Sequence, residues 1–188
     1  YSVGIPSSMM LMMPSLLVSA LNGILAAFSQ VYVAVLGIYF KLQTFIYMPA
    51  NGMIQGMRPI IGYNYGAGQY ERVRQTIRYC LLGTAAIMLL GTILSLAVPG
   101  GILQLFQADA ELLAEGETAL RIISLGFLIS TVGTVFAGVF EALGRGGESL
   151  LISLLRQLVI TVPAGYILSR FLGASGIWIA FPVSELAA

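Results

Sequence analysis

Long uninterrupted apolar runs limit the fold of this sequence more than any other feature. Five of them, at about residues 3–27, 31–63, 77–98, 119–143 and 150–172, are long enough to cross a bilayer as helices, since a spanning helix needs ~20 residues. A sixth run begins near residue 177 and is shorter. Because hydrocarbon offers the backbone no water to bond, such runs form α-helices. We expect an all-α integral membrane bundle of five transmembrane helices plus part of a sixth.

Composition argues against several functional classes. Only 9% of the residues are charged and the net charge is +1, whereas soluble domains have about 25% charged residues and nucleic-acid binding needs a basic patch. There is no His, and Cys80 is the one cysteine, which argues against a metal site, a disulfide or thiol–imidazole catalysis. We therefore predict no enzyme, no metal, no cofactor and no nucleic-acid partner.

Both ends of the sequence lie in apolar runs. Tyr1 leads directly into the first run without the basic segment that opens a signal peptide, and Ala188 ends the sixth run. We expect the chain to be a fragment of a longer membrane protein.

The charges of the loops predict an orientation. The loop at 64–78 has three arginines and one acid, while the loop at 99–118 has four acids and no basic residue. By the positive-inside rule, 64–78 is cytoplasmic and 99–118 is external, and alternation places the turn at 142–149 in the cytoplasm. Lys41 and Arg170 fall near the outer side, so most but not all of the Lys and Arg residues obey the rule.

The acidic loop contains a helix-start signal. Asp109 is followed by acids in the next turn, a pattern typical of a helix N-terminus, where the macrodipole favours anions. We expect a short interfacial helix that leads into the fourth run. A solvated acidic loop is the alternative.

The stretch at 52–68, GMIQGMRPIIGYNYGAG, concentrates polar and helix-breaking residues inside an apolar chain. Pro49 and Pro59 predict a kink or local unwinding of the second helix. Asn51 and Gln55 are spaced i,i+4 and share one helix face, which in a membrane must point into the bundle or toward a wet cavity. They form either an interhelical hydrogen-bond clamp or part of a substrate path.

Few other polar groups interrupt the runs. Asn22 and Gln157 join Asn51 and Gln55 as substrate-cavity candidates. Arg58 has a stem long enough to reach the cytoplasmic headgroups. Arg156 can do the same, or pair with Glu148 or Glu141.

Two acids are candidates for holding a coupling ion. Glu141 closes the fourth run, where an ordinary interfacial acid is the alternative interpretation. Glu185 lies within the sixth run, and an acid at membrane depth is a functional candidate because burying its charge is costly.

Three motifs together resemble one transporter family. Residues 49–67 match the pattern P-x-x-G-[ILM]-x-Q-G-x-x-P-[IL]-I-[GS]-[FY]-N-Y-G-A nearly throughout, FEALGRG occupies 140–146, and GIWIAFPVSELAA occupies 176–188. They resemble the C-terminal lobe of MATE (multidrug and toxic compound extrusion) transporters. The resemblance implies that residues 1–188 are helices seven to eleven and the start of helix twelve, one lobe of a twelve-helix, two-lobe protein.

The resemblance also implies a function. The family are secondary active antiporters of the plasma membrane that export cationic or amphipathic drugs and other xenobiotics in exchange for H⁺ or Na⁺ by alternating access. The implied partners are those small compounds, the lipid bilayer and the missing N-terminal lobe of the same chain. The alternative is a lipid-linked precursor flippase of the same superfamily, which would need more basic residues than Arg58 and Arg156.

One departure from the family concerns ion coupling. Several Na⁺-coupled members have a carboxylate in the middle of helix seven and another in helix ten. Here the first run has no acid, and Glu141 stands at the end of its helix where the family usually has Gln. We therefore place the coupling site in the N-terminal half, as a hypothesis.

Overall fold

Helices and short connections make up the whole described chain. The computed structural model describes residues 4–187, and no β-strand occurs among them. Residues 1–3 and 188, at the ends of the first and sixth apolar runs, lie outside this range. The elements are α1 (Gly4–Leu25), α2 (Gln30–Gly66), α3 (Tyr70–Ala97), α4 (Pro99–Gln104), α5 (Ala110–Ala142), α6 (Gly146–Leu154), a π-helical turn η1 (Leu155–Ile160), α7 (Thr161–Leu172) and α8 (Ala174–Ala187).

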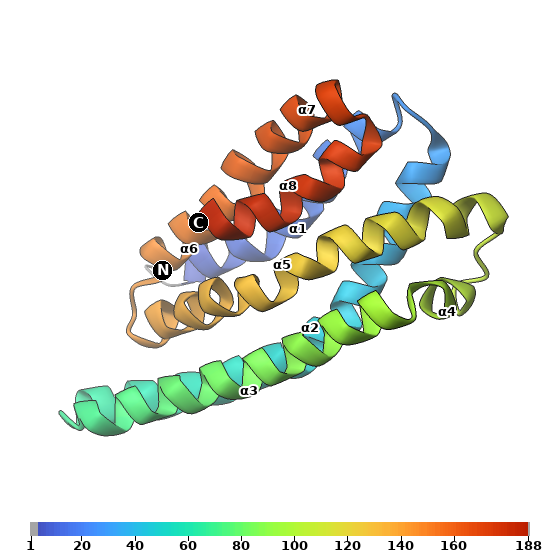
Figure 1. The fold of residues 1–188 in the computed structure, drawn as a ribbon. Helices are drawn as coiled ribbons and strands as arrows, with labels where there is room; N and C mark the ends of the chain where they lie inside the picture. The colour runs from blue at the N-terminus through green and yellow to red at the C-terminus, as the bar shows by residue number, and fades with distance from the viewer. Residues whose placement is uncertain (1–3, 188) are drawn as a thin grey trace.

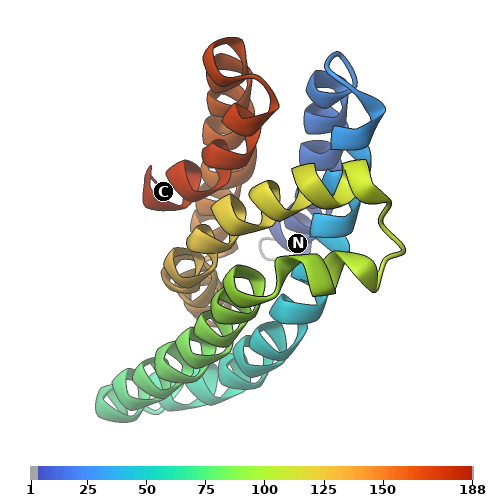
Figure 2. The ribbon, with the colours of Figure 1, turned by 45° about the vertical axis from the view of Figure 1, so that its right-hand side comes forward.

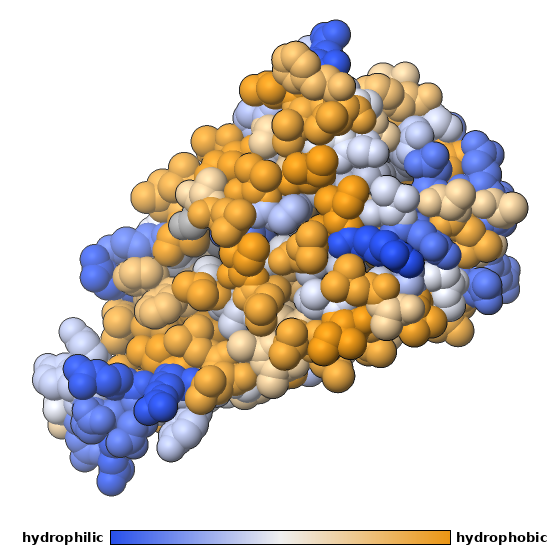
Figure 3. All heavy atoms as spheres, in the orientation of Figure 1, coloured by the Kyte–Doolittle hydropathy of each residue, from blue (hydrophilic) through white to orange (hydrophobic). Residues whose placement is uncertain are grey.

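Five helical segments are long and apolar enough to cross a membrane, as predicted. They are Ser8–Leu25, Gln30–Gly66, Tyr70–Ala97, Ala110–Ala142 and Gly146–Leu172, while the apolar helix Ala174–Ala187 is shorter. Figure 3 shows apolar side chains over most of the middle of one face, with hydrophilic residues gathered toward its ends. This distribution is that of a bundle whose middle lies in hydrocarbon.

The second helix is continuous, so of the two outcomes predicted at its prolines, a kink or local unwinding, the unwinding does not occur. Pro49 and Pro59 both lie inside α2, and the helix runs unbroken for 37 residues. Ser29 caps its N-terminus, and the Ser29 hydroxyl accepts a hydrogen bond from the Val31 N–H at 3.2 Å. A proline removes only one intrahelical bond and can be absorbed by a bend. Figure 2 shows α2 changing direction along its length.

The fifth apolar run is interrupted instead, by the π-helical turn η1. Pro163 lies three residues beyond it, and a proline has no N–H for the carbonyl four residues earlier and crowds it. Thr161 Oγ1 donates to the Arg156 carbonyl at 2.6 Å, which satisfies one acceptor of the widened turn. Wide turns of this kind are frequent at functional sites.

The acidic loop contains the start of the long helix α5 and does not form a short helix of its own. The Asp109 carboxylate accepts a hydrogen bond from the Leu112 N–H at 2.9 Å and caps α5. The acids that follow belong to the first turns of that long helix, so the predicted helix start is correct and the predicted separate interfacial helix is wrong. The separate short helix is α4, upstream of the acids.

Helix α5 is the centre of the bundle. It packs against α2 and α3 on one side and against α8 and α6 on the other, while α1 lies mainly against α6 and η1. Figure 1 shows this order, with α7 and α8 paired at one edge and α2 and α3 at the other. Aromatic rings join the two halves, since Tyr39 of α2 stacks near Phe127 of α5, at 6.3 Å between centroids, and meets Phe181 of α8 edge-on at 5.2 Å.

The loops predicted to share a membrane side lie at the same end. A Cβ added to Gly62, near the end of α2, would stand 3.5 Å from the Ala142 carbonyl oxygen at the end of α5. The turn after α2 and the turn after α5 are therefore neighbours. The α3–α5 connection and the α7–α8 turn lie at the opposite end (Figure 1). The alternation of the loops is thus present in the fold, and the compartment each faces stays a prediction.

The α7–α8 turn depends on a close backbone approach. A Cβ added to Gly176 would overlap the Leu168 carbonyl group and would stand 2.7 Å from the Ser169 nitrogen. Both neighbours are backbone atoms of α7 and cannot rotate away, so only glycine fits at this position.

We predict that Gly176→Val separates α7 from α8 and destabilises the protein by more than the ~1–3 kcal/mol typical of overpacking. Thermal unfolding of the detergent-purified protein measures the loss. Gly147→Ala is the matched control, because nothing lies within 4 Å of a Cβ built at that exposed glycine. Equal stability of the two variants would contradict the packing argument.

Candidate functional site

A hollow of about 470 Å³ opens where α1, α2, α5, η1 and α8 meet. Its volume is within the ~300–1,000 Å³ of small-molecule pockets. Most of its lining is apolar or aromatic, with amides, hydroxyls and two charged groups between. The lining residues are Pro14, Leu17, Phe40, Gln43, Thr44, Tyr47, Met48, Asn51, Thr134, Arg156, Gln157, Thr161, Phe181, Ser184 and Glu185.

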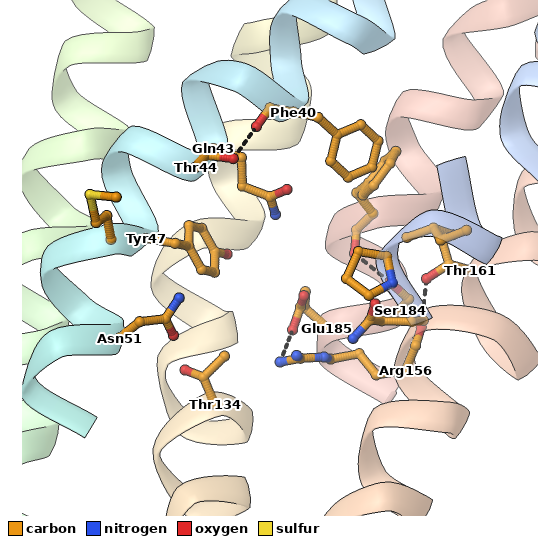
Figure 4. Close-up of a pocket in the computed structure, with 15 residues that line it drawn as sticks. Phe40, Gln43, Thr44, Tyr47, Asn51, Thr134, Arg156, Thr161, Ser184 and Glu185 are labelled. Atoms are coloured by element: carbon orange, nitrogen blue, oxygen red, sulfur yellow. Dashed lines mark hydrogen bonds and ion pairs between the residues drawn. The ribbon is translucent and has the colours of Figure 1, made fainter. Parts of the chain in front are cut away.

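The side of the hollow formed by α2 and α5 carries neutral polar groups. The Tyr47 hydroxyl shares a hydrogen bond of 2.6 Å with Ser130 Oγ, which fixes its ring. The Thr134 hydroxyl donates to the Ser130 carbonyl at 2.8 Å, within its own helix. Asn51 is exposed, and in Figure 4 no hydrogen bond joins it to the other residues drawn. Its amide therefore has donors and acceptors available to a guest.

An ion pair forms the opposite wall. Arg156 of η1 and Glu185 of α8 lie 3.4 Å apart between Nη1 and Oε2, with 14% and 19% of their side chains exposed. They face Asn51 and Thr134 across the hollow (Figure 4). The prediction that Arg156 reaches the headgroups or pairs with Glu148 or Glu141 is wrong, because the π-helical turn carries Arg156 toward α8.

The α5 helix leaves room for this pair. A Cβ added to Gly133 would stand 3.1 Å from Arg156 Nη1, so the glycine lets the guanidinium come close to the helix. The Arg156 Nε–H is buried and has no partner within the described residues. The guanidinium thus keeps one donor unused beside its carboxylate.

The pair also borders a second, smaller hollow. This one holds about 380 Å³ and shares Arg156 and Glu185 with the first. Its remaining lining residues are Ile129, Val132, Gly133, Phe136, Ile152 and Leu186. The ion pair is therefore a polar partition between two hollows.

A second ion pair joins α2 to α5 away from the hollow. Arg58 Nη2 lies 2.8 Å from Glu141 Oε2, with 30% and 12% of the side chains exposed. The Ser149 hydroxyl of α6 donates to Glu141 at 3.3 Å. Arg58, predicted to reach the headgroups, thus has a carboxylate partner on the neighbouring helix, which the sequence analysis did not identify; its position relative to the headgroups stays a prediction.

The sequence candidates divide into two groups. Asn51, Gln157 and Glu185 line the hollow, whereas Asn22, Gln55 and Glu141 are not among its lining residues. Gln55 lies one turn beyond Asn51 on α2, and its side chain is exposed. Their roles in substrate or ion binding stay predictions.

Several residues that line the hollow were not predicted from the sequence. Tyr47, Thr134 and Ser184 are ordinary members of apolar helices, and hydroxyls there usually bond their own helix. The weak signal that existed was their depth, near the middle of each run. No group of three or more His, Cys, Asp or Glu side chains that could hold a metal ion occurs among the residues the structure describes.

Comparison with known proteins places this geometry in a family. The chain is 24% identical over 185 residues to a multidrug export protein, MepA, of Staphylococcus haemolyticus (strain JCSC1435), covering 98% of this chain and 40% of the relative. The MepA of Staphylococcus aureus (strain MSSA476) is also 24% identical, with 41% of its length covered. The chain thus spans about two-fifths of the length of these curated relatives.

Solved structures agree on the fold. An outward-facing multidrug resistance MATE family transporter superimposes with a TM-score of 0.93 at 24% identity, over 99% of this chain and 42% of that one. A MOP superfamily transporter from Pyrococcus furiosus Vc1 (DSM3638) gives a TM-score of 0.92 at 21% identity, again over 99% and 42%. The chain therefore has the fold of one lobe of these twelve-helix, two-lobe membrane proteins.

The family model for MatE matches residues 6–167. With five apolar helices and this match over most of the sequence, the chain is a multi-pass membrane protein that belongs to the MatE family.

Proposed function

We propose that this chain is the C-terminal lobe, helices seven to eleven and the start of twelve, of an exporter of amphipathic compounds. The observation that carries the proposal is the hollow at the centre of the lobe. Its walls combine apolar and aromatic surface with a few neutral polar groups and one ion pair, a lining suited to guests of varied shape. The relatives named as multidrug export proteins support the same activity.

The transport mechanism we propose is alternating access with a second lobe. The relatives are more than twice as long as this chain, which leaves room for an N-terminal lobe as partner. Rocking of the two lobes would expose the hollow to one side of the membrane and then the other. In this proposal the protein lies in the plasma membrane, with loops 64–78 and 142–149 in the cytoplasm and 99–118 outside.

The alternative of a lipid-linked precursor flippase fits the hollow less well. A phosphate-bearing precursor needs cations free to bind it. Arg156 is paired with Glu185 and Arg58 with Glu141. The described lining therefore offers no uncompensated cation, which favours drugs and other xenobiotics.

The coupling ion, H⁺ or Na⁺, is proposed to bind in the other lobe. Both candidate acids of this chain already have an arginine partner at 3.4 Å or closer. A nearby arginine competes with a second cation for the carboxylate. Neither acid then offers an empty cation site.

We predict that Asn51→Ala changes which compounds are exported and leaves the amount of membrane protein unchanged. Asn51 is exposed, so only a guest loses contact. One lost hydrogen bond, at ~1 kcal/mol, corresponds to about a fivefold loss for the compounds that use it. Growth of expressing cells on a panel of toxic amphiphiles measures the change.

The control for this measurement is Gln104→Ala, an exposed glutamine on α4 away from the hollow, which should leave the profile unchanged. Gln55→Ala tests the second residue of the predicted face. Loss of the folded protein in Asn51→Ala would show instead that the residue is a packing clamp.

A further prediction concerns coupling. Glu141→Gln and Glu185→Gln should each leave export responsive to an imposed H⁺ or Na⁺ gradient, because neither acid holds the coupling ion. Uptake into proteoliposomes with and without each gradient measures the response. Export that stays gradient-driven after every N-terminal-lobe carboxylate has been neutralised would disprove this placement.

A further inference from the structure

The end of the α2–α3 hairpin is basic and aromatic. It comprises residues 63–79, the hairpin tip, and Figure 3 shows hydrophilic residues gathered at the corner where Figure 1 draws the turn between α2 and α3. Its charged residues are one acid, Glu71, and three arginines, Arg72, Arg74 and Arg78, so three minus one gives a net charge of +2. All four are exposed, and none of them lines the hollow.

Two of these arginines have no acidic partner among the residues that the structure describes. Arg72 and Arg78 form no ion pair there. Arg74 Nη1 lies 3.4 Å from Glu71 Oε2, with 83% and 68% of the side chains exposed, and an exposed pair of this kind contributes little. Arg72 and Arg74 also stand in the first two turns of α3, where the helix dipole disfavours cations. Helix stability therefore does not account for this positive surface.

An exposed stripe of α3 leads away from the arginines, and its chemistry changes along the helix. From the tip toward the middle of the helix it carries Arg72, Gln75, Tyr79, Leu82, Ala86, Leu89 and Ile93, all exposed. Spacings of three and four residues keep these side chains on one helix face. The order, basic, then aromatic, then aliphatic, matches the headgroup, the interface and the acyl chain of a phospholipid.

The depths along α3 agree with this order. The apolar run at 77–98 is ~33 Å long at 1.5 Å per residue, close to the ~30 Å of the hydrocarbon core. Tyr79 therefore lies at the edge of the hydrocarbon, where tyrosine is enriched in membrane proteins. Tyr63 of α2, 77% exposed, lies at the same end of the hairpin. Arg72 stands ~10 Å further along the helix than Tyr79, at the level of the headgroups.

We propose that the hairpin tip binds the phosphate headgroup of an anionic phospholipid whose acyl chain lies along the α3 stripe. Guanidinium groups bind phosphate oxygens by charge-assisted and frequently bidentate hydrogen bonds, and basic clusters beside a transmembrane helix attract anionic lipids. The net charge of +2 favours an anionic lipid over a zwitterionic one. The inference is independent of the proposed export function, because it does not depend on what occupies the hollow.

The test measures which lipid lies beside the stripe. A bimane fluorophore is attached to Gln75→Cys of the full-length transporter in nanodiscs, and the native Cys80 of this chain is buried. The probes are phosphatidylglycerol and phosphatidylcholine with the same spin-labelled acyl chain, which quenches a nearby fluorophore. We expect phosphatidylglycerol to be preferred at this site about tenfold, since one arginine near an anionic surface is worth about fivefold in binding.

Variants should move this preference in both directions. Arg72→Gln with Arg74→Gln and Arg78→Gln should abolish it, whereas the same three changes to lysine keep the charge and should keep most of it. Glu71→Gln removes the acid that competes for Arg74 and should increase it.

The matched control removes three cations from outside the hairpin tip. Lys41→Gln with Arg121→Gln and Arg170→Gln alters the net charge by the same amount at exposed positions. This variant should leave the lipid preference beside the fluorophore unchanged.

Four results would overturn the inference. They are equal quenching by the two lipids, an unchanged preference in the triple glutamine variant of the tip, an equal loss in the control, and no quenching by either lipid, which would show that protein covers the stripe. Soluble glycerol 3-phosphate should not relieve the quenching, and relief would assign the arginines to a free phosphate ester. If the triple variant does not fold, the wild-type preference and Glu71→Gln still decide. The export proposal is tested separately, by Asn51→Ala.

Discussion

A backbone in hydrocarbon must make its own hydrogen bonds, and the rest of this structure depends on that constraint. It accounts for the unbroken α2 helix, where two prolines bend the chain but do not unwind it. It also explains the buried hydroxyls, since Ser124, Ser130 and Ser169 each donate to a carbonyl three residues earlier in their own helix. Polar side chains are tolerated inside the bundle because the helix itself provides their partner.

Within the described spans, the π-helical turn η1 is also where Arg156 meets Glu185. Pro163 cannot bond the preceding turn, the turn widens into η1, and Thr161 satisfies the Arg156 carbonyl. The same turn directs the Arg156 side chain toward Glu185 on α8. A buried charge is strongly destabilising without a partner. The π-helical turn, which directs Arg156 inward, and Glu185, which is distant in the sequence, therefore have to occur together.

Much of the architecture was readable from the sequence. Run lengths predicted the five spans, Asp109 predicted the start of α5, and the i,i+4 polar pair directed attention to Asn51. The unpredicted partners of Arg58 and Arg156 share one cause. Sequence indicates the depth of Arg58 and Arg156 in the bilayer but not their direction around the helix axis, and long side chains reach headgroups or a neighbour with equal ease. The partners Glu141 and Glu185 come from other helices, so only packing could identify them.

The sequence by itself determined that this chain is an apolar helical bundle, and its motifs pointed to the MatE family. Both properties follow from the order of residues along single helices, which sets span length and local capping. The tertiary structure alone decided which candidates meet in the hollow, which acids are neutralised by arginines, and that the fifth span contains a π-helical turn. These depend on contacts between helices far apart in the sequence, because a side chain's partner in the membrane is chosen by the helix packed beside it.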